Sequence, residues 1–132
     1  MLSRRSKARW KALVAVTLAA ALAVTLVLAT TGSARTTKLK LQASPSGALK
    51  FSRKKLSAKA GTVTIVMTNP KSSGLTHAIE ISGHGVEKEG KKVGPGHTST
   101  ASAKLKAGTY TFYCPVDGHK AAGMKGKLVV TK

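Results

Sequence analysis

Hydrophobic and polar residues alternate along much of residues 35–132 with the period of two that is typical of β-strands. The alternating or β-branched runs are residues 39–41, 62–68, 79–81, 101–105 and 128–131. Clusters of Gly, Pro, Ser and Asn separate these runs, as turns do, at residues 44–47, 69–74, 94–96 and 107–108. The pattern predicts an all-β domain, a β-sandwich of about seven to eight short strands. The longest predicted loop, residues 83–96, has room for a short helix.

The first 34 residues differ in kind from the rest of the chain. A basic stretch without acidic residues, 4–11, precedes an uncharged apolar run, 12–29, and small residues follow, including Gly32 and Ala34. This order predicts a secretory signal peptide. The apolar run also approaches the length of a membrane span, so an uncleaved N-terminal membrane anchor is the alternative. Both interpretations place residues 35–132 outside the cytoplasm, as a secreted, periplasmic or membrane-tethered domain.

Length and charge limit what this domain can be. A chain of 132 residues holds one ordinary domain, predicted at residues 35–132, and excludes multi-domain oxidases and kinases. Its 18 Lys and Arg residues face 4 Asp and Glu, a net charge of +14. So few carboxylates argue against a two-carboxylate glycosidase and a Mg²⁺ or Ca²⁺ site. The charge favours an acidic protein, or an anionic membrane or wall surface, over nucleic acid; a merely solubilising surface is the alternative.

Cys114 is the single cysteine of the sequence. Small exported domains usually pair their cysteines, and a lone cysteine cannot form an internal disulfide. Four roles remain open for it at this point: an inert buried thiol, an intermolecular bridge, a nucleophile, or a thiolate ligand of a metal ion.

Cys114 is followed by two further potential metal ligands. It comes two residues after Phe112 and four after Tyr110, so it lies on the core-facing side at the end of a predicted strand. Met124 is in phase with the hydrophobic positions of the last predicted strand. The connection between the two strands carries His119, five residues from each. The three side chains are therefore expected to meet at one end of the sandwich.

His77 supplies a fourth candidate, because it is in phase with Ile79 and Ile81 at the start of another predicted strand. Two imidazoles, one thiolate and one thioether make the donor set of a blue-copper centre, with a trigonal His₂Cys plane and a weak axial Met. The remaining histidines, His84 and His97, lie among glycines and are expected on the surface, whereas Met67 is expected in the core.

The stretch 107–114, with His119 and Met124 after it, resembles the cupredoxin family, which includes plastocyanins, azurins and auracyanins. The resemblance covers nearly all of residues 37–132, and the equal spacing of four residues on each side of His119 is more similar to auracyanin-like proteins than to plastocyanin or azurin. It implies a Greek-key sandwich with one type 1 copper ion at one end, bound by His77, Cys114, His119 and Met124. It also implies a monomeric electron carrier, which exchanges electrons with redox partner proteins through an apolar rim around His119.

One position departs from the family pattern. Many members carry a polar residue directly after the first histidine ligand, where its side chain helps to hold the cysteine loop, but this chain has Ala78. Asn69, or Thr76 through its backbone, could replace that contact. The carbonyl of Thr76 could also approach the metal axially, as in azurin.

Three other functions have to be compared with electron transfer. A Cys114–His119 nucleophile would make the protein an enzyme, but no orienting group or substrate-binding motif accompanies the pair, so we expect no enzyme. A module for copper delivery or storage is the main alternative, and it would be expected to offer exposed, exchangeable ligands. A metal-free adhesive sandwich would leave all four candidate ligands unexplained.

Overall fold

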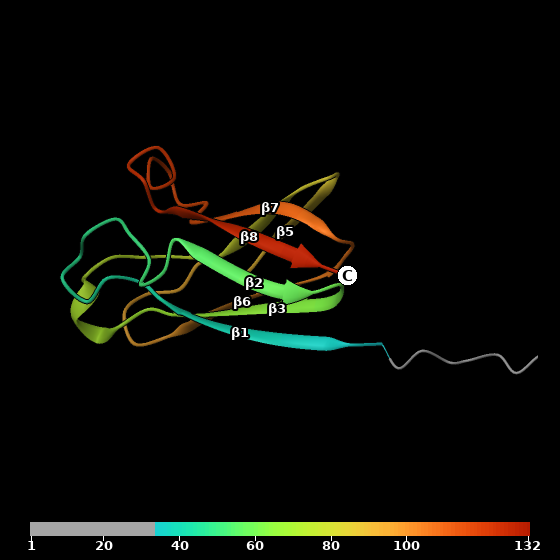
Figure 1. Ribbon diagram of the computed structural model, residues 1–132. Coiled ribbons are helices and arrows are strands. Elements are labelled where there is room, and N and C mark those ends of the chain that lie inside the picture. The colour runs from blue at the N-terminus through green and yellow to red at the C-terminus, as the bar shows by residue number, and fades with distance from the viewer. Residues whose placement is uncertain (1–33) are drawn as a thin grey trace, which may run out of the picture. The chain divides into compact units, whose positions relative to one another are not determined.

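The computed structural model describes residues 34–132, which form two β-sheets packed face to face (Figure 1). Almost all of the regular structure is strand, as the alternating pattern predicts. The elements are β1 (Thr36–Gln42), β2 (Lys55–Lys59), β3 (Gly61–Thr68), the 3₁₀ turn η1 (Lys71–Ser73), β4 (Glu80–Gly83), β5 (Val86–Glu89), β6 (Thr98–Leu105), β7 (Gly108–Tyr113) and β8 (Lys125–Thr131).

The two sheets have the strand orders β1-β3-β6 and β2-β8-β7-β4-β5. The pairs β1·β3 and β2·β8 are parallel, and the other pairs are antiparallel. Successive strands repeatedly change sheet, so the chain closes one core between two layers. The prediction of an all-β, Greek-key sandwich of seven to eight strands is confirmed. The prediction of a loop or short helix at residues 83–96 is wrong in part, because Val86–Glu89 forms β5 against β4.

The core lies between the sheets and is built from the residues that the alternation places inward. The inward residues of β3 and β6, with Ile81, Phe112 and Leu128 of the facing sheet, are almost completely buried. The rings of Phe51 and Phe112 pack at a centroid distance of 5.8 Å. Met67 is fully buried among them, as expected. The core therefore fixes β7 and β8, the two strands that flank the candidate ligand loop.

Residues 77–80 do not follow the predicted alternation. His77, Ala78, Ile79 and Glu80 are all buried, and β4 begins only at Glu80. His77 thus lies outside the strand and not at its first position. Glu80, expected to face solvent, is paired with Glu89 on one side and Tyr113 on the other, and its side chain contacts those of Glu87 and Tyr113. Side chains of the flanking strands β5 and β7 therefore cover a residue that the alternation within β4 alone would place in solvent.

The predicted signal or anchor segment, residues 1–34, lies outside the described residues except for Ala34, and the domain boundary at residue 35 stays a prediction. Within the part of the chain that the structure describes, no helix is long and apolar enough to cross a membrane.

Candidate metal centre

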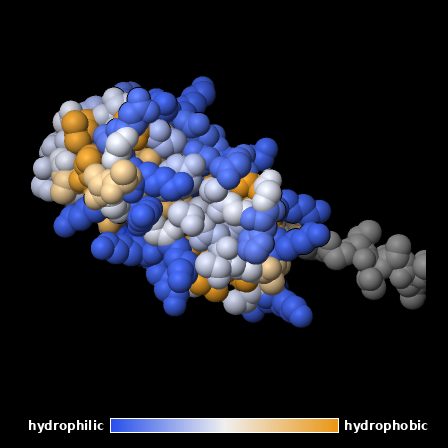
Figure 2. Space-filling view, turned by 90° about the horizontal axis from the view of Figure 1, so that it is seen from above, coloured by the Kyte–Doolittle hydropathy of each residue, from blue (hydrophilic) through white to orange (hydrophobic). Residues whose placement is uncertain are grey.

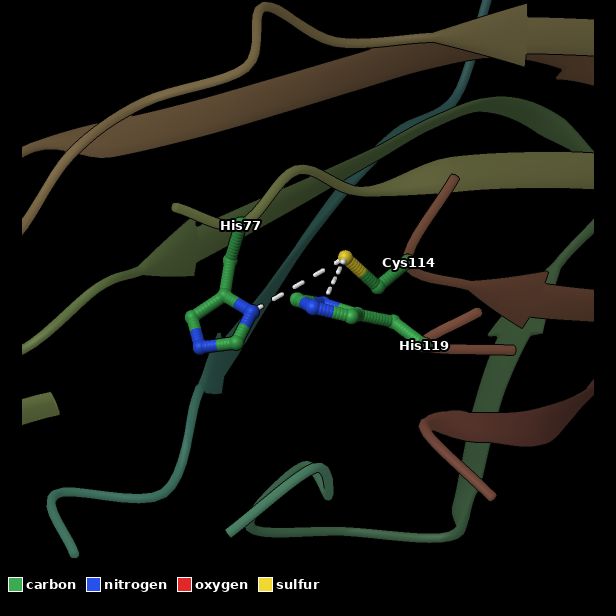
Figure 3. Close-up of side chains that lie close together, drawn as sticks. All are labelled: His77, Cys114 and His119. Atoms are coloured by element: carbon green, nitrogen blue, oxygen red, sulfur yellow. Dashed lines mark hydrogen bonds between the residues drawn. The ribbon is translucent and has the colours of Figure 1, made fainter. Parts of the chain in front are cut away.

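His77, Cys114 and His119 come together at one end of the sandwich, although the first is 37 residues from the second along the chain (Figure 3). Their ligand atoms all lie within 4.8 Å of one another. The Sγ atom of Cys114 is 3.9 Å from Nδ1 of His77 and 3.5 Å from Nδ1 of His119. Figure 3 shows both imidazole rings with a nitrogen turned toward the sulfur. Three of the four predicted ligands thus lie together, and their binding of a metal ion stays a prediction.

The loop between β7 and β8 holds its shape through its own backbone. The N–H of Cys114 donates to the carbonyl of Met124, and the N–H of Met124 donates to the carbonyl of His119, both at 3.0 Å. The N–H of His119 in turn donates to the carbonyl of Val116 at 3.0 Å. Gly118 and Gly123 take positive φ angles, which L-residues rarely adopt, and so permit the tight turn. Cys114, His119 and Met124 are therefore placed by one hydrogen-bonded unit.

Met124 fits the expected arrangement by its position. It is completely buried, and it directly precedes β8. Its carbonyl accepts from the N–H of Cys114, and its N–H donates to the carbonyl of His119. Its role as the fourth ligand stays a prediction.

His77 is held by a different part of the chain. Its N–H donates to the carbonyl of Val93 at 3.0 Å, and the N–H of Val93 donates back to the carbonyl of His77 at 2.8 Å. This isolated bridge lies outside the named strands. Sequence reasoning missed Val93, and no local signal could have found it, because the partner is 16 residues away in a segment without alternation.

The structure shows whether Asn69 replaces the polar side chain that is missing at position 78. Asn69 contacts the His77 side of the site, through Leu75 and Val93, and makes no hydrogen bond to the cysteine loop. The expectation that Asn69 holds that loop is therefore wrong, because the backbone pairing of Cys114 with Met124 already closes it. Thr76 is exposed, and its carbonyl as an axial donor stays a prediction.

Burial sets the protonation of the cluster. Burial lowers the pKa of His77, and the nearby charge of His119 lowers it further, so His77 is neutral with a free ring nitrogen near neutral pH. Burial raises the pKa of the Cys114 thiol, while the N–H groups of Ala78 and Val116 lower it. The N–H of Ala78 lies 3.5 Å from Sγ. Peptide dipoles directed at the sulfur favour its charged form.

The cluster is closed on one side and open on the other. His77 and Cys114 are completely buried, whereas the ring of His119 is only half-buried. His84 and His97 are exposed, as predicted, and lie outside the cluster. Next to His119, the ammonium of Lys120 lies 3.6 Å from the centre of the Tyr113 ring. His119 is therefore the one candidate ligand whose edge reaches the surface.

The donors fit a copper ion. The Sγ atom of Cys114 lies 3.5 Å from the nitrogen of His119 and 3.9 Å from that of His77, separations short enough for one ion to contact all three atoms. A thiolate with two imidazoles and a thioether is the donor set of a type 1 copper centre. Both the geometry and the chemistry of the residues therefore suit this ion.

Comparison with solved structures gives the same fold. The chain is similar to auracyanin B, with a TM-score of 0.63 and 23% identity over 72% of this chain and 88% of that one. It is similar to auracyanin A, a "blue" copper protein from Chloroflexus aurantiacus, with a TM-score of 0.59 and 22% identity over 74% of this chain and 100% of that one. It is also similar to a copper nitrite reductase from Nitrosomonas europaea, with a TM-score of 0.60 and 22% identity, covering 74% of this chain and 42% of that one. The fold thus occurs in an enzyme as well.

Sequence comparison identifies the family. No curated protein sequence matches the chain significantly. The family model of the cupredoxin-like domain, however, matches residues 16–130, which is most of the 132 residues. With the two-sheet sandwich and the cluster of His77, Cys114 and His119 in place, this chain belongs to the cupredoxin-like domain family and carries the residues of a blue-copper centre.

Proposed function

We propose that the protein carries single electrons on one copper ion bound by His77, Cys114, His119 and Met124. The observation that carries this proposal is the convergence of three ligand atoms within 4.8 Å at a site where two of the three residues are completely buried. A buried, preformed set of soft and intermediate donors suits an ion that stays bound while it changes oxidation state. We propose a carrier and not an enzyme.

Each donor type has a separate task. A copper ion bound there supplies a one-electron Cu(II)/Cu(I) couple. Thiolate and thioether favour the reduced state, and imidazole accepts both states. The hydrogen-bonded loop from Cys114 to Met124 keeps these donors in one arrangement, so that little rearrangement accompanies the change of charge.

His119 is the proposed point of electron exchange. It is the half-buried member of the cluster, and its own loop carries four apolar residues that are half-buried or exposed: Pro115, Val116, Ala121 and Ala122. Leu75, a large hydrophobic residue, is 38% exposed and lies two residues before His77. Figure 2 shows hydrophilic side chains over most of the visible face, with hydrophobic ones gathered at the end that holds this loop in Figure 1. An apolar rim allows close approach of a partner without a large desolvation cost.

The proposed partners are redox proteins with an acidic surface. Beside the ligand loop, the outer face of β8 and β7 has a hollow of about 520 Å³ lined by Lys54, Lys120, Lys125 and Lys127. These lysines are part of the net charge of +14 predicted for residues 35–132. A concave basic surface close to His119 steers an acidic partner toward the exchange point. We propose that the protein acts as a monomer outside the cytoplasm.

The test is spectroscopy of the copper-loaded protein followed by a redox titration. Electron transfer predicts an intense visible thiolate-to-copper band, a type 1 EPR spectrum, and repeated reversible reduction and oxidation without loss of copper. Tight copper binding without reversible cycling would support copper delivery or storage instead. Absence of the visible band from the copper-loaded protein would refute the ligand assignment.

A further inference from the structure

Asn69 is a completely buried polar residue directly after β3, and its side chain is fully hydrogen-bonded. Its Nδ2 group donates to the carbonyl of Leu75 at 2.8 Å and to the carbonyl of Val93 at 3.0 Å. Its Oδ1 atom accepts from the hydroxyl of Ser73. Both N–H donors of the amide are therefore used to join two segments that are distant in sequence.

The main chain of Asn69 is bound as firmly as its side chain. Its N–H donates to the carbonyl of His97 at 2.8 Å, and its carbonyl accepts from the N–H of Gly96 at 2.7 Å. The residue is thus anchored to the end of β3 and to the turn before β6. Because the backbone of Asn69 is held at both its N–H and its carbonyl, its side chain can hold other groups in place.

The two carbonyls that Asn69 binds frame His77. Leu75 is two residues before His77, and Val93 forms the reciprocal backbone bridge with it. The carbonyl of Val93 accepts from both the Asn69 amide and the His77 N–H. Asn69 therefore fixes the peptide frame of His77 from the segment before it and from the segment opposite it.

His77 has few other restraints. It lies three residues before β4, outside the sheet ladder, and its neighbour Ala78 offers no polar side chain. Its Nε2 atom is buried and has no hydrogen-bond partner in the structure. Apart from the 3.9 Å contact between its Nδ1 atom and Sγ of Cys114, the direction of the His77 ring therefore depends on packing and on the backbone that Asn69 holds.

We propose that Asn69 is the positioning residue for the first histidine ligand, and this inference rests on the proposed copper function. Asn69 does not touch the metal position. It orders the segments that carry Leu75 and Val93, so that Nδ1 of His77 faces Sγ of Cys114 before copper binds. A preordered ligand lowers the free energy needed to form the site.

Two substitutions separate this role from simple packing. Asn69→Ala removes both donors to the carbonyls, and Asn69→Asp keeps the size and the acceptor for Ser73 but loses the same donors. Ser73→Ala is the comparison variant, because it removes the bond to Oδ1 of Asn69 and the longer contacts of Ser73 with Leu75, at 3.4 and 3.5 Å, but leaves both donor bonds of the Asn69 amide. Each protein is loaded with copper and checked for folding by circular dichroism.

The measurements are the Cu(II) EPR hyperfine splitting, the reduction potential and the rate of copper release to a chelator. We expect both Asn69 variants to alter the splitting and the potential and to release copper about tenfold faster, with Ser73→Ala close to the wild type. A folded Asn69→Ala protein with wild-type values of all three would overturn the inference. A wild-type protein without a blue band would instead refute the proposed function.

A measurement on the wild type covers the case in which both variants fail to fold. Coupling between two sites is reciprocal, so if Asn69 orders His77 for copper, bound copper must strengthen the contacts of Asn69. The side-chain amide protons of Asn69 are then expected to exchange with water more slowly in the Cu(I) protein than in the metal-free protein. Equal exchange rates in the two forms would overturn the inference.

Discussion

The N–H of Cys114 donates a 3.0 Å hydrogen bond to the carbonyl of Met124, ten residues further along the chain. This bond pairs the residue after β7 with the residue before β8, which makes the ligand loop an extension of the β7·β8 ladder. One backbone hydrogen bond thereby holds both the residue with the strong candidate donor, a thiolate, and the residue with the weak one, a thioether. Substitutions of either side chain can change the donor while the backbone contact remains.

Replacement of the thiol tests the strongest donor. Cys114→Ser is expected to remove the intense visible band of the Cu(II) protein and most of its copper affinity, because the band arises from thiolate-to-copper charge transfer. Absorption spectra and a competitive copper titration measure both effects. His84→Gln and His97→Gln are the controls, since both residues are exposed and outside the cluster, and both variants should keep the band. A variant at Cys114 that keeps the band would contradict the assignment.

The axial role of Met124 predicts opposite shifts in potential for two substitutions. Met124→Gln should keep copper and lower the reduction potential, because an oxygen donor favours Cu(II). Met124→Leu should raise the potential, because a donor is lost. Cyclic voltammetry measures both. Met67→Leu is the matched control, since Met67 is equally buried but lies in β3, and its potential should not change. Unchanged potentials in both Met124 variants would mean that Met124 only fills space.

Charge on the face beside the ligand loop is expected to direct partner docking. The triple variant Lys54→Gln, Lys125→Gln, Lys127→Gln should slow electron transfer with a small acidic redox protein at low salt by about tenfold, because steering is lost. Stopped-flow kinetics measures the bimolecular rate. Added salt should shrink the difference, since the Debye length falls from about 30 Å at 0.01 M to about 8 Å at 0.15 M.

A second triple variant controls for net charge. Lys38→Gln, Lys40→Gln, Lys104→Gln removes the same charge from exposed positions on the three-stranded sheet. Its rate should fall less. An equal fall in both triple variants would show that total charge, and not the face near His119, controls the encounter.

Glu80 gives a pH dependence of stability. Burial raises the pKa of Glu80 above its ordinary value of 4.5, and a hydrogen bond with Glu87 raises it further, although Tyr113 opposes this. The folded protein therefore binds this proton more tightly than the unfolded chain does. Its stabilising contribution is complete below pH 4.5 and declines as the pH rises through the raised pKa.

Glu80→Gln removes this dependence. The variant should therefore gain stability relative to the wild type as the pH rises from about 4 to about 7. Urea unfolding of the metal-free proteins at both pH values measures the free energies of unfolding. Glu89→Gln, at the exposed residue paired with Glu80, controls for the loss of a negative charge. An identical pH dependence in the wild type and Glu80→Gln would contradict the interpretation.

Gly126 marks a tight contact between β8 and the core. A Cβ atom at this position would lie 2.6 Å from the carbonyl oxygen of Lys54 and would overlap the ring of Phe112. Gly126→Ala is expected to lower the free energy of unfolding by about 1–3 kcal/mol, as overpacking does. Gly94→Ala is the control, because a Cβ there meets nothing within 4 Å, and it should change the free energy by much less. Urea unfolding curves compare the two variants.

The sequence by itself determined the class of the fold, and it predicted four candidate ligands whose binding of a metal ion stays a prediction: His77, Cys114, His119 and Met124. Alternation with a period of two shows which residues of one strand face the core, and it correctly placed Val63, Ile65 and Met67 inward. Short spacings within one loop also restrict how far apart side chains can lie. Cys114, His119 and Met124 could therefore be grouped from their spacing alone, before any pairing of strands was known.

The tertiary structure decided which distant segments meet. His77 reaches Cys114 only because β4 pairs with β7, and it is fixed by Val93 and Asn69, which no local pattern connects with it. The burial of Glu80 likewise depends on strands on both sides. A local pattern records the preference of a side chain for core or solvent, whereas a contact between segments depends on sheet register and on hydrogen bonds satisfied across the whole domain.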